Sequence, residues 1–329
     1  MMNSPANLRL ENLTSTNEKM ARCLKLAALA AESDVPVLIL GETGTGKTLL
    51  GRAIHNSSQR AGAPFISFNA SAMSDTLLES QLFGHERGAF TGAVSTLKGK
   101  FELADKGTLF LDELADMSQL AQAKILRAVE YGEFERLGSE RMLRANAHVI
   151  SATNCSLRDK IREGKFRLDL FHRLSGLTLV IPALRDRADE LPALIAMELK
   201  ASAAAATKKI TAIHPEAMKM LMAHEWRGNL RELKHMVRTM ALFCQGQVIL
   251  PEHVVFPPDL DFDQPDATDR IRCEPAPENG RPALTLASAV RHHIRSVYEQ
   301  NSRNQRRTAK HLGISRATLA RHLQKPDQK

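Results

Sequence analysis

Short apolar runs recur along the first half of the chain. They span residues 35–40, 64–68, 108–111 and 148–152. Runs of this kind are typical of strands buried in a parallel sheet, which need little polar alternation because both faces are covered. Helix-favouring sequence over residues 18–31 leads into the first run, and another such segment follows its glycine-rich turn. The pattern therefore predicts an α/β fold with a parallel sheet.

The strand pattern stops near residue 185. Residues 189–200 have helical spacing, Pro215 is placed to begin a helix, and a further helix is expected from Asn229. We therefore expect a small all-helical lid. Residues 256–282 then hold six prolines and seven Asp or Glu with little apolar content, which is typical of an extended linker.

The last segment predicts a helix-turn-helix. Residues 284–300 have the apolar spacing of one amphipathic helix. In residues 305–323 a helix is expected to stop at Gly313, and after a three-residue turn Ser315 can cap a second helix. The small core of this motif would be Ala309, Leu312, Ile314, Leu319 and Leu323. The side chains expected to contact DNA are Arg306, Arg307, Ser315, Arg316, Thr318 and Arg321.

Charge separates this tail from the rest of the chain. Residues 284–329 hold ten Lys or Arg and two Asp or Glu, which equals the net charge of +8 for all 329 residues. A basic end segment on a neutral body indicates an appendage that binds a polyanion. A solvated basic tail, or a generic helical hairpin with a basic surface, is the alternative.

Cysteine usage and hydropathy indicate the cytosol. The four cysteines are far apart and form no C-x-x-C pair, so we expect free thiols in a reducing compartment. The N-terminus has no signal pattern, and no apolar run approaches the roughly 18 residues that a membrane span needs. We therefore expect a soluble, cytoplasmic protein without membrane insertion.

A phosphate-binding motif directly follows the first apolar run. Gly41, Gly44, Gly46, Lys47 and Thr48 fit G-x-x-x-x-G-K-[ST]. In this motif glycines let backbone N–H groups wrap a phosphate chain, the lysine reaches the outer phosphates, and the hydroxyl binds Mg²⁺. The N-terminus of the next helix adds a favourable dipole for the anion. The alternative is an ordinary glycine turn, which does not explain the strand before it.

Polar residues follow the other apolar runs. Asn69 follows the second, Asp112 and Glu113 follow the third, and Asn154 lies just after the fourth. At the carboxyl ends of parallel strands, one carboxylate would hold Mg²⁺ and the next would polarise the attacking water, which an amide could orient. Ordinary surface charge is the alternative for a lone Asp-Glu pair.

Two further stretches are unusual. Residues 79–93, ESQLFGHERGAFTGA, are rich in glycine and favour neither helix nor strand, so we expect an apolar side chain displayed on a mobile loop. A buried structural loop with Phe90 in the core is the alternative. Arg167 and Arg173, six residues apart in FRLDLFHRL, belong to no phosphate site of their own and taken singly would be solvated or salt-bridged arginines.

Together these stretches resemble one family. GETGTGKT, ESQLFGHERGAFTGA, GTLFLDE, QAKILRAVEYGEFERLG, SATN, FRLDLFHRL, PALRDR and GNLREL occur in the order and spacing of the AAA+ domain of bacterial enhancer-binding proteins, the ATPases that activate sigma-54 RNA polymerase. The resemblance covers about residues 10–257, and GAFTGA is nearly confined to this family. Because the ATPase begins almost at once, the chain resembles the short members without a regulatory domain, such as the phage shock activator.

The resemblance implies ATP and Mg²⁺ as cofactors and a role for each motif. The phosphate loop, Gly41, Glu42, Thr43, Gly44, Thr45, Gly46, Lys47 and Thr48, would bind ATP together with the lid's Arg231. Thr48 and Asp112 would hold Mg²⁺, and Glu113 would activate water. Asn69 would be the switch residue that keeps Glu113 from water, and Asn154 would orient that water. Arg167 and Arg173 would be fingers supplied to a neighbouring subunit, which implies a ring, usually a hexamer.

The resemblance also implies partners. Sigma-54 RNA polymerase holoenzyme would contact the loop formed by Gly88, Ala89, Phe90, Thr91, Gly92 and Ala93, and a short loop after residues 130–138 would move with it. The C-terminal segment is similar to the Fis-type DNA-binding domain, whose paired subunits would bind palindromic double-stranded enhancer DNA. Apart from the resemblance, because no sensing domain is expected, control would come from an inhibitor protein acting in trans or from the level of expression.

We therefore expect four regions. Residues 1–183 would form the α/β ATPase subdomain, 184–256 the helical lid, 257–283 the linker and 284–329 the all-α DNA-binding domain. The chain departs from the family at Thr48, where an acidic residue is usual, and at Arg227, where proline is usual. A DNA-binding regulator that does not remodel sigma-54, and an AAA+ chaperone or helicase, are the alternative functions.

Overall fold

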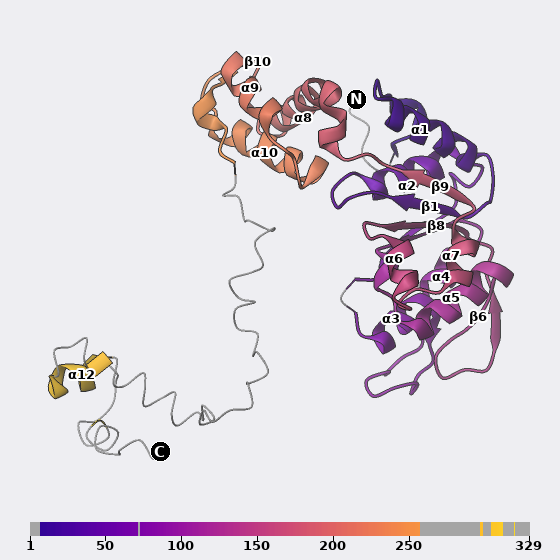
Figure 1. Ribbon diagram of the computed structural model, residues 1–329. Coiled ribbons are helices and arrows are strands. Elements are labelled where there is room, and N and C mark those ends of the chain that lie inside the picture. Colours follow the sequence, from indigo (N-terminus) through magenta and orange to yellow (C-terminus); the bar gives the residue numbers. More distant parts are fainter. Residues whose placement is uncertain (1–6, 72, 257–296, 299–303, 312–318, 320–329) are drawn as a thin grey trace. The chain divides into compact units, whose positions relative to one another are not determined.

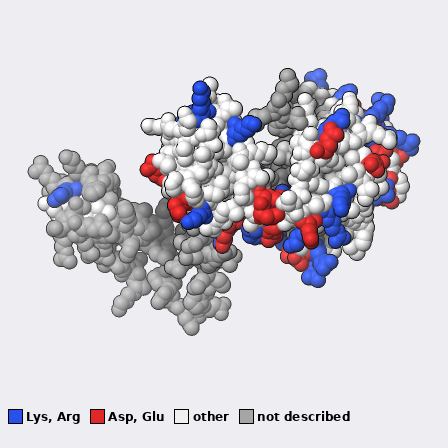
Figure 2. All heavy atoms as spheres, turned by 90° about the horizontal axis from the view of Figure 1, so that it is seen from above, with Lys and Arg blue, Asp and Glu red and all other residues white. Residues whose placement is uncertain are grey.

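The computed structural model describes residues 7–71, 73–256, 297–298, 304–311 and 319. The chain divides into two units, Met1–Pro258 and Asp259–Lys329. Every element that builds the candidate site belongs to the first unit. On the face of that unit drawn in Figure 2, acidic and basic side chains are interspersed, in keeping with the neutral body that the charge count predicts.

A five-stranded parallel sheet forms the centre of the first unit (Figure 1), with strand order β2-β5-β8-β1-β9. Four of its strands confirm the predicted apolar runs. The fifth, β9, was not predicted, and it extends the sheet beside β1. The bounds are β1 Val37–Leu40, β2 Phe65–Asn69, β5 Thr108–Asp112, β8 His148–Thr153 and β9 Leu177–Val180.

Helices cover both faces of this sheet. Alternate residues of β5 point to opposite faces, so Phe110 packs in the core beneath α1 and α2, while Leu109 and Leu111 pack in the core beneath α3, α5 and α7. Gly51 in α2 lets the Phe110 ring lie close to the helix, because a Cβ there would collide with it. The helix bounds are α1 Glu18–Ala31, α2 Lys47–Ser57, α3 Asp75–Phe83, α4 Lys100–Leu103, α5 Gln119–Tyr131, α6 Leu157–Arg162 and α7 Leu168–Leu174.

The helix ends follow local chemistry. The Asn17 side chain accepts a hydrogen bond from Met20 N and begins α1 at the predicted residue. The Ser118 side chain caps α5 in the same way, and Gly132, with a φ of 71°, ends that helix in the left-handed region that favours glycine.

The lid is a second, mostly helical core. It comprises α8 Leu191–Ala205, α9 Pro215–Ala223 and α10 Asn229–Phe243, which pack around Trp226 and the α10 residues Val237 and Met240. The helix starts predicted at Pro215 and Asn229 are confirmed. The predicted helical lid is confirmed, but it is not all-helical, because β10 Ala212–Ile213 and β11 Val248–Ile249 pair in parallel. Pairs of two residues are too short to leave a pattern in the sequence.

Short strands and 3₁₀ turns complete the described elements. Two antiparallel hairpins, which the sequence did not predict, lie next to the GAFTGA loop: β3 Gly84–His85 with β4 Leu97–Lys98, and β6 Glu133–Glu135 with β7 Met142–Arg144. The 3₁₀ turns are η2 Leu10–Asn12, η3 Leu114–Asp116, η4 Leu184–Glu190 and η5 Pro251–His253. Among the described residues, no helix is long and apolar enough to cross a membrane.

Candidate active site

The phosphate loop has the predicted strand, turn and helix. β1 ends at Leu40, and α2 begins at Lys47. Gly44 and Gly46 have φ values of 82° and 99°, which side chains strongly disfavour, so the turn requires glycine at both positions. The Thr45 hydroxyl donates to the Glu42 carbonyl at 2.8 Å and closes the loop on itself.

Lys47 lies inside this loop and beside the acidic pair. It is only 6% exposed. Its Nζ donates to the Gly41 carbonyl at 2.9 Å and lies 3.9 Å from Glu113 Oε1. A cation so placed, at the start of a helix, is suited to the phosphates of a nucleotide.

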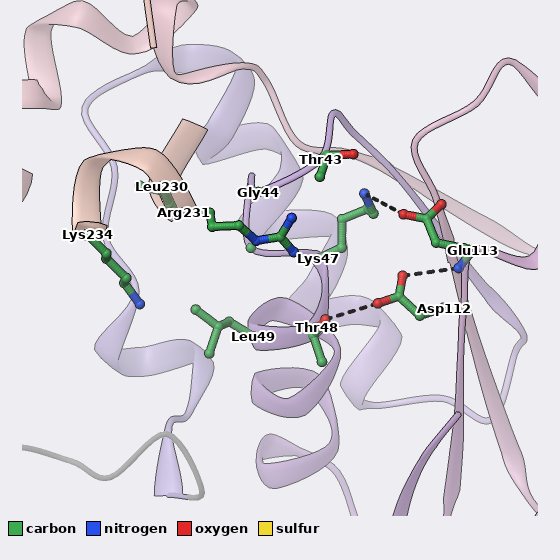
Figure 3. Close-up of a pocket in the computed structure, with 11 residues that line it drawn as sticks. Thr43, Gly44, Lys47, Thr48, Leu49, Asp112, Glu113, Leu230, Arg231 and Lys234 are labelled. Atoms are coloured by element: carbon green, nitrogen blue, oxygen red, sulfur yellow. Dashed lines mark hydrogen bonds and ion pairs between the residues drawn. The ribbon is translucent and has the colours of Figure 1, made fainter. Parts of the chain in front are cut away.

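A pocket of about 270 Å³ opens at this point (Figure 3). The phosphate loop, the end of β5 and the start of α10 contribute its walls. The lining residues are Thr43, Gly44, Gly46, Lys47, Thr48, Leu49, Asp112, Glu113, Leu230, Arg231 and Lys234. The pocket therefore combines most of the predicted phosphate loop with the predicted acidic pair and the predicted lid arginine.

The acidic pair, Asp112 and Glu113, lines the pocket together with Thr48. Thr48 Oγ1 and Asp112 Oδ2 are 3.4 Å apart, with both oxygens facing the pocket. They fit Mg²⁺, which prefers oxygen ligands and commonly takes one or two from protein and the others from phosphate and water. The described residues include no cluster of three or more His, Cys, Asp or Glu that would hold a metal without a nucleotide.

Glu113 has an unusual backbone. Its φ of 53° and ψ of 44° lie in the left-handed region, which a glutamate rarely adopts. The Asp112 carboxylate accepts from Glu113 N at 3.1 Å and helps to hold this conformation. The Glu113 carboxylate then reaches back to Asn154 N, at 3.3 Å, as well as toward Lys47.

The two asparagines make contacts other than those expected from their roles. Asn69 lies beside Asp112 in the sheet, but its side-chain oxygen accepts from Ser71 N at 2.8 Å and from the Ser71 hydroxyl at 2.7 Å. Asn154 donates from its amide to Thr43 Oγ1 at 2.8 Å and so reaches the phosphate loop. In this conformation both side-chain amides are engaged with neighbouring hydroxyl groups.

The predicted arginine fingers lie outside the pocket of their own chain. Arg167 pairs with Asp169 at 2.7 Å. The hydrogen bond from the Arg167 guanidinium holds the pKa of the Asp169 carboxyl below its ordinary value. Arg173 is exposed and donates to the Glu130 carbonyl at 3.2 Å. Neither lines the pocket.

The lid contributes residues that the sequence reasoning missed. Leu230 and Lys234 line the pocket on either side of the predicted Arg231, in the first turns of α10. Their helical spacing would have indicated a shared face. Asn229, also missed, donates to Glu42 at 3.1 Å. Glu42 pairs with Arg185, and the Arg185 and Asn229 hydrogen bonds hold the pKa of the Glu42 carboxyl below its ordinary value.

The GAFTGA loop corrects one expectation. Gly88 and Gly92 have φ values of 86° and 103°, so they form turns that favour glycine. Phe90, expected to be displayed, is half-buried, with its ring edge-on to His85 at 5.1 Å between centroids. Between β3 and β4, the most exposed large apolar side chain is Val94, at 81%, which directly follows the GAFTGA motif. Of the other loop residues, Thr91 is exposed, Ala89 half-buried and Ala93 buried.

Only part of the predicted DNA-binding segment is described. The helix α12 Gln305–His311 is preceded by Asn304, whose side chain accepts from Arg307 N at 3.1 Å. Arg307 is exposed, whereas Ala309 and Leu319 are buried. The side chain of Arg306, and all of Ser315, Arg316, Thr318 and Arg321, lie outside the described residues.

Two families match most of the first unit. The sigma-54 interaction domain matches residues 13–180, and the AAA+ ATPase lid domain matches residues 185–270. The crystal structure of NtrX from Brucella abortus in complex with ATP has a TM-score of 0.68 at 31% identity, over 94% of this chain and 68% of NtrX. RuvB of Thermotoga maritima, at 17% identity and a TM-score of 0.50, shares the fold.

Curated relatives extend the same result. The regulatory protein AtoC of Escherichia coli is 40% identical over 95% of this chain and 67% of its own length. The anaerobic nitric oxide reductase transcription regulator NorR of Aeromonas hydrophila is 43% identical over 69% of this chain and 45% of its own. The Nif-specific regulatory protein of Enterobacter agglomerans is 40% identical over 77% of this chain and 48% of its own length. The chain thus spans between about half and two thirds of these relatives, and it belongs to the sigma-54 interaction domain family of AAA+ ATPases, the sigma-54-dependent transcriptional activators.

Proposed function

We propose that the chain activates transcription by hydrolysing ATP and using the energy to remodel the closed sigma-54 RNA polymerase complex. The observation that carries this proposal is one pocket that joins Lys47, the Asp112 and Glu113 pair and Arg231, in a chain that also displays a GAFTGA loop. A phosphate loop alone would support nucleotide binding. The added carboxylates and lid cation support hydrolysis, and the loop supports a sigma-54 partner.

In this proposal each side chain acts on ATP from its present place. Lys47 and Arg231 neutralise charge on the outer phosphates, and Thr48 and Asp112 would hold Mg²⁺ between them. Mg²⁺, when bound, would neutralise negative charge on the phosphate oxygens and so favour attack by water. Glu113 accepts the proton of that water as general base, because its carboxylate faces the phosphate loop and is not one of the two groups that would hold Mg²⁺.

Asn69 and Asn154 control access to that base. The Asn154 backbone N–H holds one Glu113 oxygen, which orients the carboxylate. If the Asn69 side chain broke its hydrogen bonds to Ser71 and formed one to the Glu113 carboxylate, that carboxylate would point away from the attacking water. The switch that the family resemblance implies therefore requires an exchange of hydrogen-bond partners by Asn69.

The other parts of the proposal concern assembly and DNA. Residues 1–183 and 184–256 would form the ATPase and its lid, and 257–283 would link them to a DNA-binding domain at 284–329. Arg306, Arg307, Ser315, Arg316, Thr318 and Arg321 would contact palindromic enhancer DNA through paired subunits. Arg167 and Arg173 would complete the site of a neighbouring subunit in a homo-oligomeric ring, a hexamer in the family, in the cytoplasm. An inhibitor acting in trans would supply control.

A binding experiment separates this function from its alternatives. The full chain is mixed with purified sigma-54 in the presence of ADP and aluminium fluoride, which mimics the transferred phosphoryl group. We expect a complex by size-exclusion chromatography that is absent with ADP alone. No complex, together with normal ATP turnover, would favour an AAA+ chaperone or helicase. No complex and no turnover, with enhancer DNA still bound, would favour a regulator that does not remodel sigma-54.

A further inference from the structure

A fully buried asparagine joins the lid to the phosphate loop. Asn229, the first residue of α10, is 0% exposed and has a φ of 54°. Asparagine is among the few residues other than glycine that adopt this left-handed region readily. Because a buried amide needs partners for its polar atoms, the contacts of Asn229 show which segments it connects.

Its side chain contacts two segments far away in the sequence. Oδ1 accepts a hydrogen bond from Leu184 N at 2.7 Å, where the chain passes from the sheet to the lid. Nδ2 donates to Glu42 Oε2 and to the Thr43 carbonyl, both at 3.1 Å, in the phosphate loop. One amide therefore connects the phosphate loop, the start of η4 and the start of α10.

Neighbouring contacts make this connection tight. Arg185, the residue after Leu184, donates to the same Glu42 carboxylate at 2.8 Å. A Cβ on Gly44 would collide with the Gly228 carbonyl oxygen, so the backbones of the loop and the lid touch without side chains between them. A shift of α10 would therefore have to break the Asn229 hydrogen bonds first.

We propose that Asn229 is a positioning residue for the nucleotide. It holds the phosphate loop and the first turn of α10 in one geometry, so that Arg231 meets the phosphates only while the Asn229 hydrogen bonds to Glu42 and Thr43 are made. The inference rests on the proposed function, because it assigns a residue to nucleotide binding in the same pocket. Its physical basis is that a charged group contributes to binding only when it is already correctly placed.

Asn229→Asp removes the hydrogen bonds to Glu42 and Thr43 but keeps the one from Leu184 N. A carboxylate at position 229 tolerates the left-handed backbone and still accepts from Leu184 N. It cannot donate, and it places a negative charge against Glu42. Asn229→Gly, in contrast, keeps the backbone conformation and removes the side-chain contacts to both segments.

We expect the Asp variant to lose nucleotide affinity. Its Kd for a fluorescent ATP analogue carrying a methylanthraniloyl group, and its KM for ATP, should both rise by about tenfold or more, which corresponds to the loss of one hydrogen bond to a charged group. The measurement uses the full chain at a concentration where turnover per subunit has reached its plateau. The maximal rate should fall less than KM rises, because the carboxylates that face the water are untouched.

A control residue that contacts the opposite end of α10 tests whether destabilisation alone explains the result. Lys208 donates to the Ala241, Leu242 and Cys244 carbonyls at the other end of α10, far along the helix from the pocket. Lys208→Met should lower the melting temperature and leave the Kd for the analogue unchanged. An Asn229→Asp effect on Kd that Lys208→Met reproduces would overturn the inference.

A second substitution tests the partner. Glu42→Gln in the Asn229→Asp protein places an amide donor opposite the new carboxylate and removes the repulsion, so part of the lost affinity should return. Independent structural damage predicts losses that add, because Glu42→Gln also weakens the pair with Arg185. Additive losses, or a normal Kd in Asn229→Asp, would overturn the assignment of Asn229. A wild-type chain that does not bind the analogue would instead overturn the proposed function.

Discussion

Glu113 has a strained backbone at the end of β5 in the candidate site. A glutamate in the left-handed region costs on the order of 1–3 kcal/mol, and such residues persist only where their surroundings hold them. Here the Asp112 carboxylate accepts from Glu113 N, and Asp116 N donates to the Glu113 carbonyl at 3.1 Å. The strained turn aims the side chain back over the phosphate loop, where a base for the attacking water is needed.

Glu113→Gln should therefore separate binding from hydrolysis. The amide keeps the size of the side chain and leaves Thr48 and Asp112 in place, so the affinity for ATP should stay near that of the wild type. Turnover should fall by about 100-fold or more, because the amide cannot accept the proton. The control is Glu163→Gln, which changes an exposed glutamate paired with Lys165, and this variant should hydrolyse ATP at the wild-type rate. Near-normal turnover in Glu113→Gln would remove the residue from the reaction.

His148 links stability to pH. It is 1% exposed at the start of β8, its Nε2 lies 3.0 Å from the Val35 carbonyl, and its Nδ1 has no hydrogen-bond partner among the described residues. Burial is the main cause that lowers the pKa of His148 below its ordinary value of 6.5. His55, also buried, shifts in the same direction for the same first reason.

Stability should consequently fall as the medium becomes acidic. Below pH 6.5 the unfolded chain takes up a proton on His148 that the folded chain refuses, so the free energy of unfolding decreases toward pH 5.5. His148→Gln, which can still donate to Val35, should flatten this decrease by up to about 1 kcal/mol per pH unit. The free energy of unfolding of the wild type and of His148→Gln is measured by urea unfolding at pH 7.5, 6.5 and 5.5. Identical slopes in the two proteins would show that His148 does not titrate here.

Some helices and strands could be predicted from their local sequence, whereas others form only through contacts with a distant partner. The strands β1, β2, β5 and β8 could be predicted because each is a short apolar run, and α9 and α10 because proline and asparagine mark their starts. The strand β9 was missed although its sequence LTLV is also a short apolar run; it is an edge strand beside β1, with Thr178 and Val180 exposed. Two-residue strands such as β3 and β10 likewise depend on a partner.

The site divides in the same way. The glycine loop and the acidic pair are contiguous in sequence, so their chemistry could be predicted. The Asn229 contact to Glu42 joins positions 187 residues apart, and no local signal could have indicated it. The docking of Phe90 on His85 was missed for a related reason, because His85 ends the two-residue strand β3 and Phe90 lies in the loop that follows, and neither conformation has a local signal.

The GAFTGA loop offers a prediction at this scale. Thr91 is exposed and does not line the pocket that holds Lys47 and Glu113, so Thr91→Ala should leave ATP turnover within about twofold of the wild type. The same substitution should abolish the complex with sigma-54. Ser95→Ala, exposed in the same loop but outside the motif, should retain both activities. Parallel loss of turnover and complex in Thr91→Ala would mean that the loop supports the fold and not the partner.

At the scale of the whole molecule, the two arginines expected to act on the transferred phosphate do not line the pocket of their own chain. Lys47, Arg231 and Lys234 face it, yet Arg167 and Arg173 lie elsewhere on the same chain. A guanidinium is well suited to the charge that develops on a transferred phosphoryl group. The described geometry therefore leaves these two arginines available to a second copy, as the family resemblance implies.

Sharing of the site between subunits should be visible in the kinetics. An arginine supplied in trans is worth roughly 10³ or more in rate, so a lone subunit should hydrolyse ATP poorly and specific activity should rise with protein concentration. Arg162→Ala, which removes an exposed arginine from α6, should leave that rise intact.

Mixing two inactive variants tests the arrangement directly. Arg173→Ala keeps an intact phosphate loop, and Lys47→Ala keeps an intact arginine, so each should be inactive alone. In a mixed ring, the phosphate loop of the first would face the arginine of the second, and some turnover should return. Co-assembly is verified by pulling down one tagged variant with the other. Turnover that does not depend on concentration, together with no recovery in mixtures that co-assemble, would return Arg173 to the ordinary surface charges.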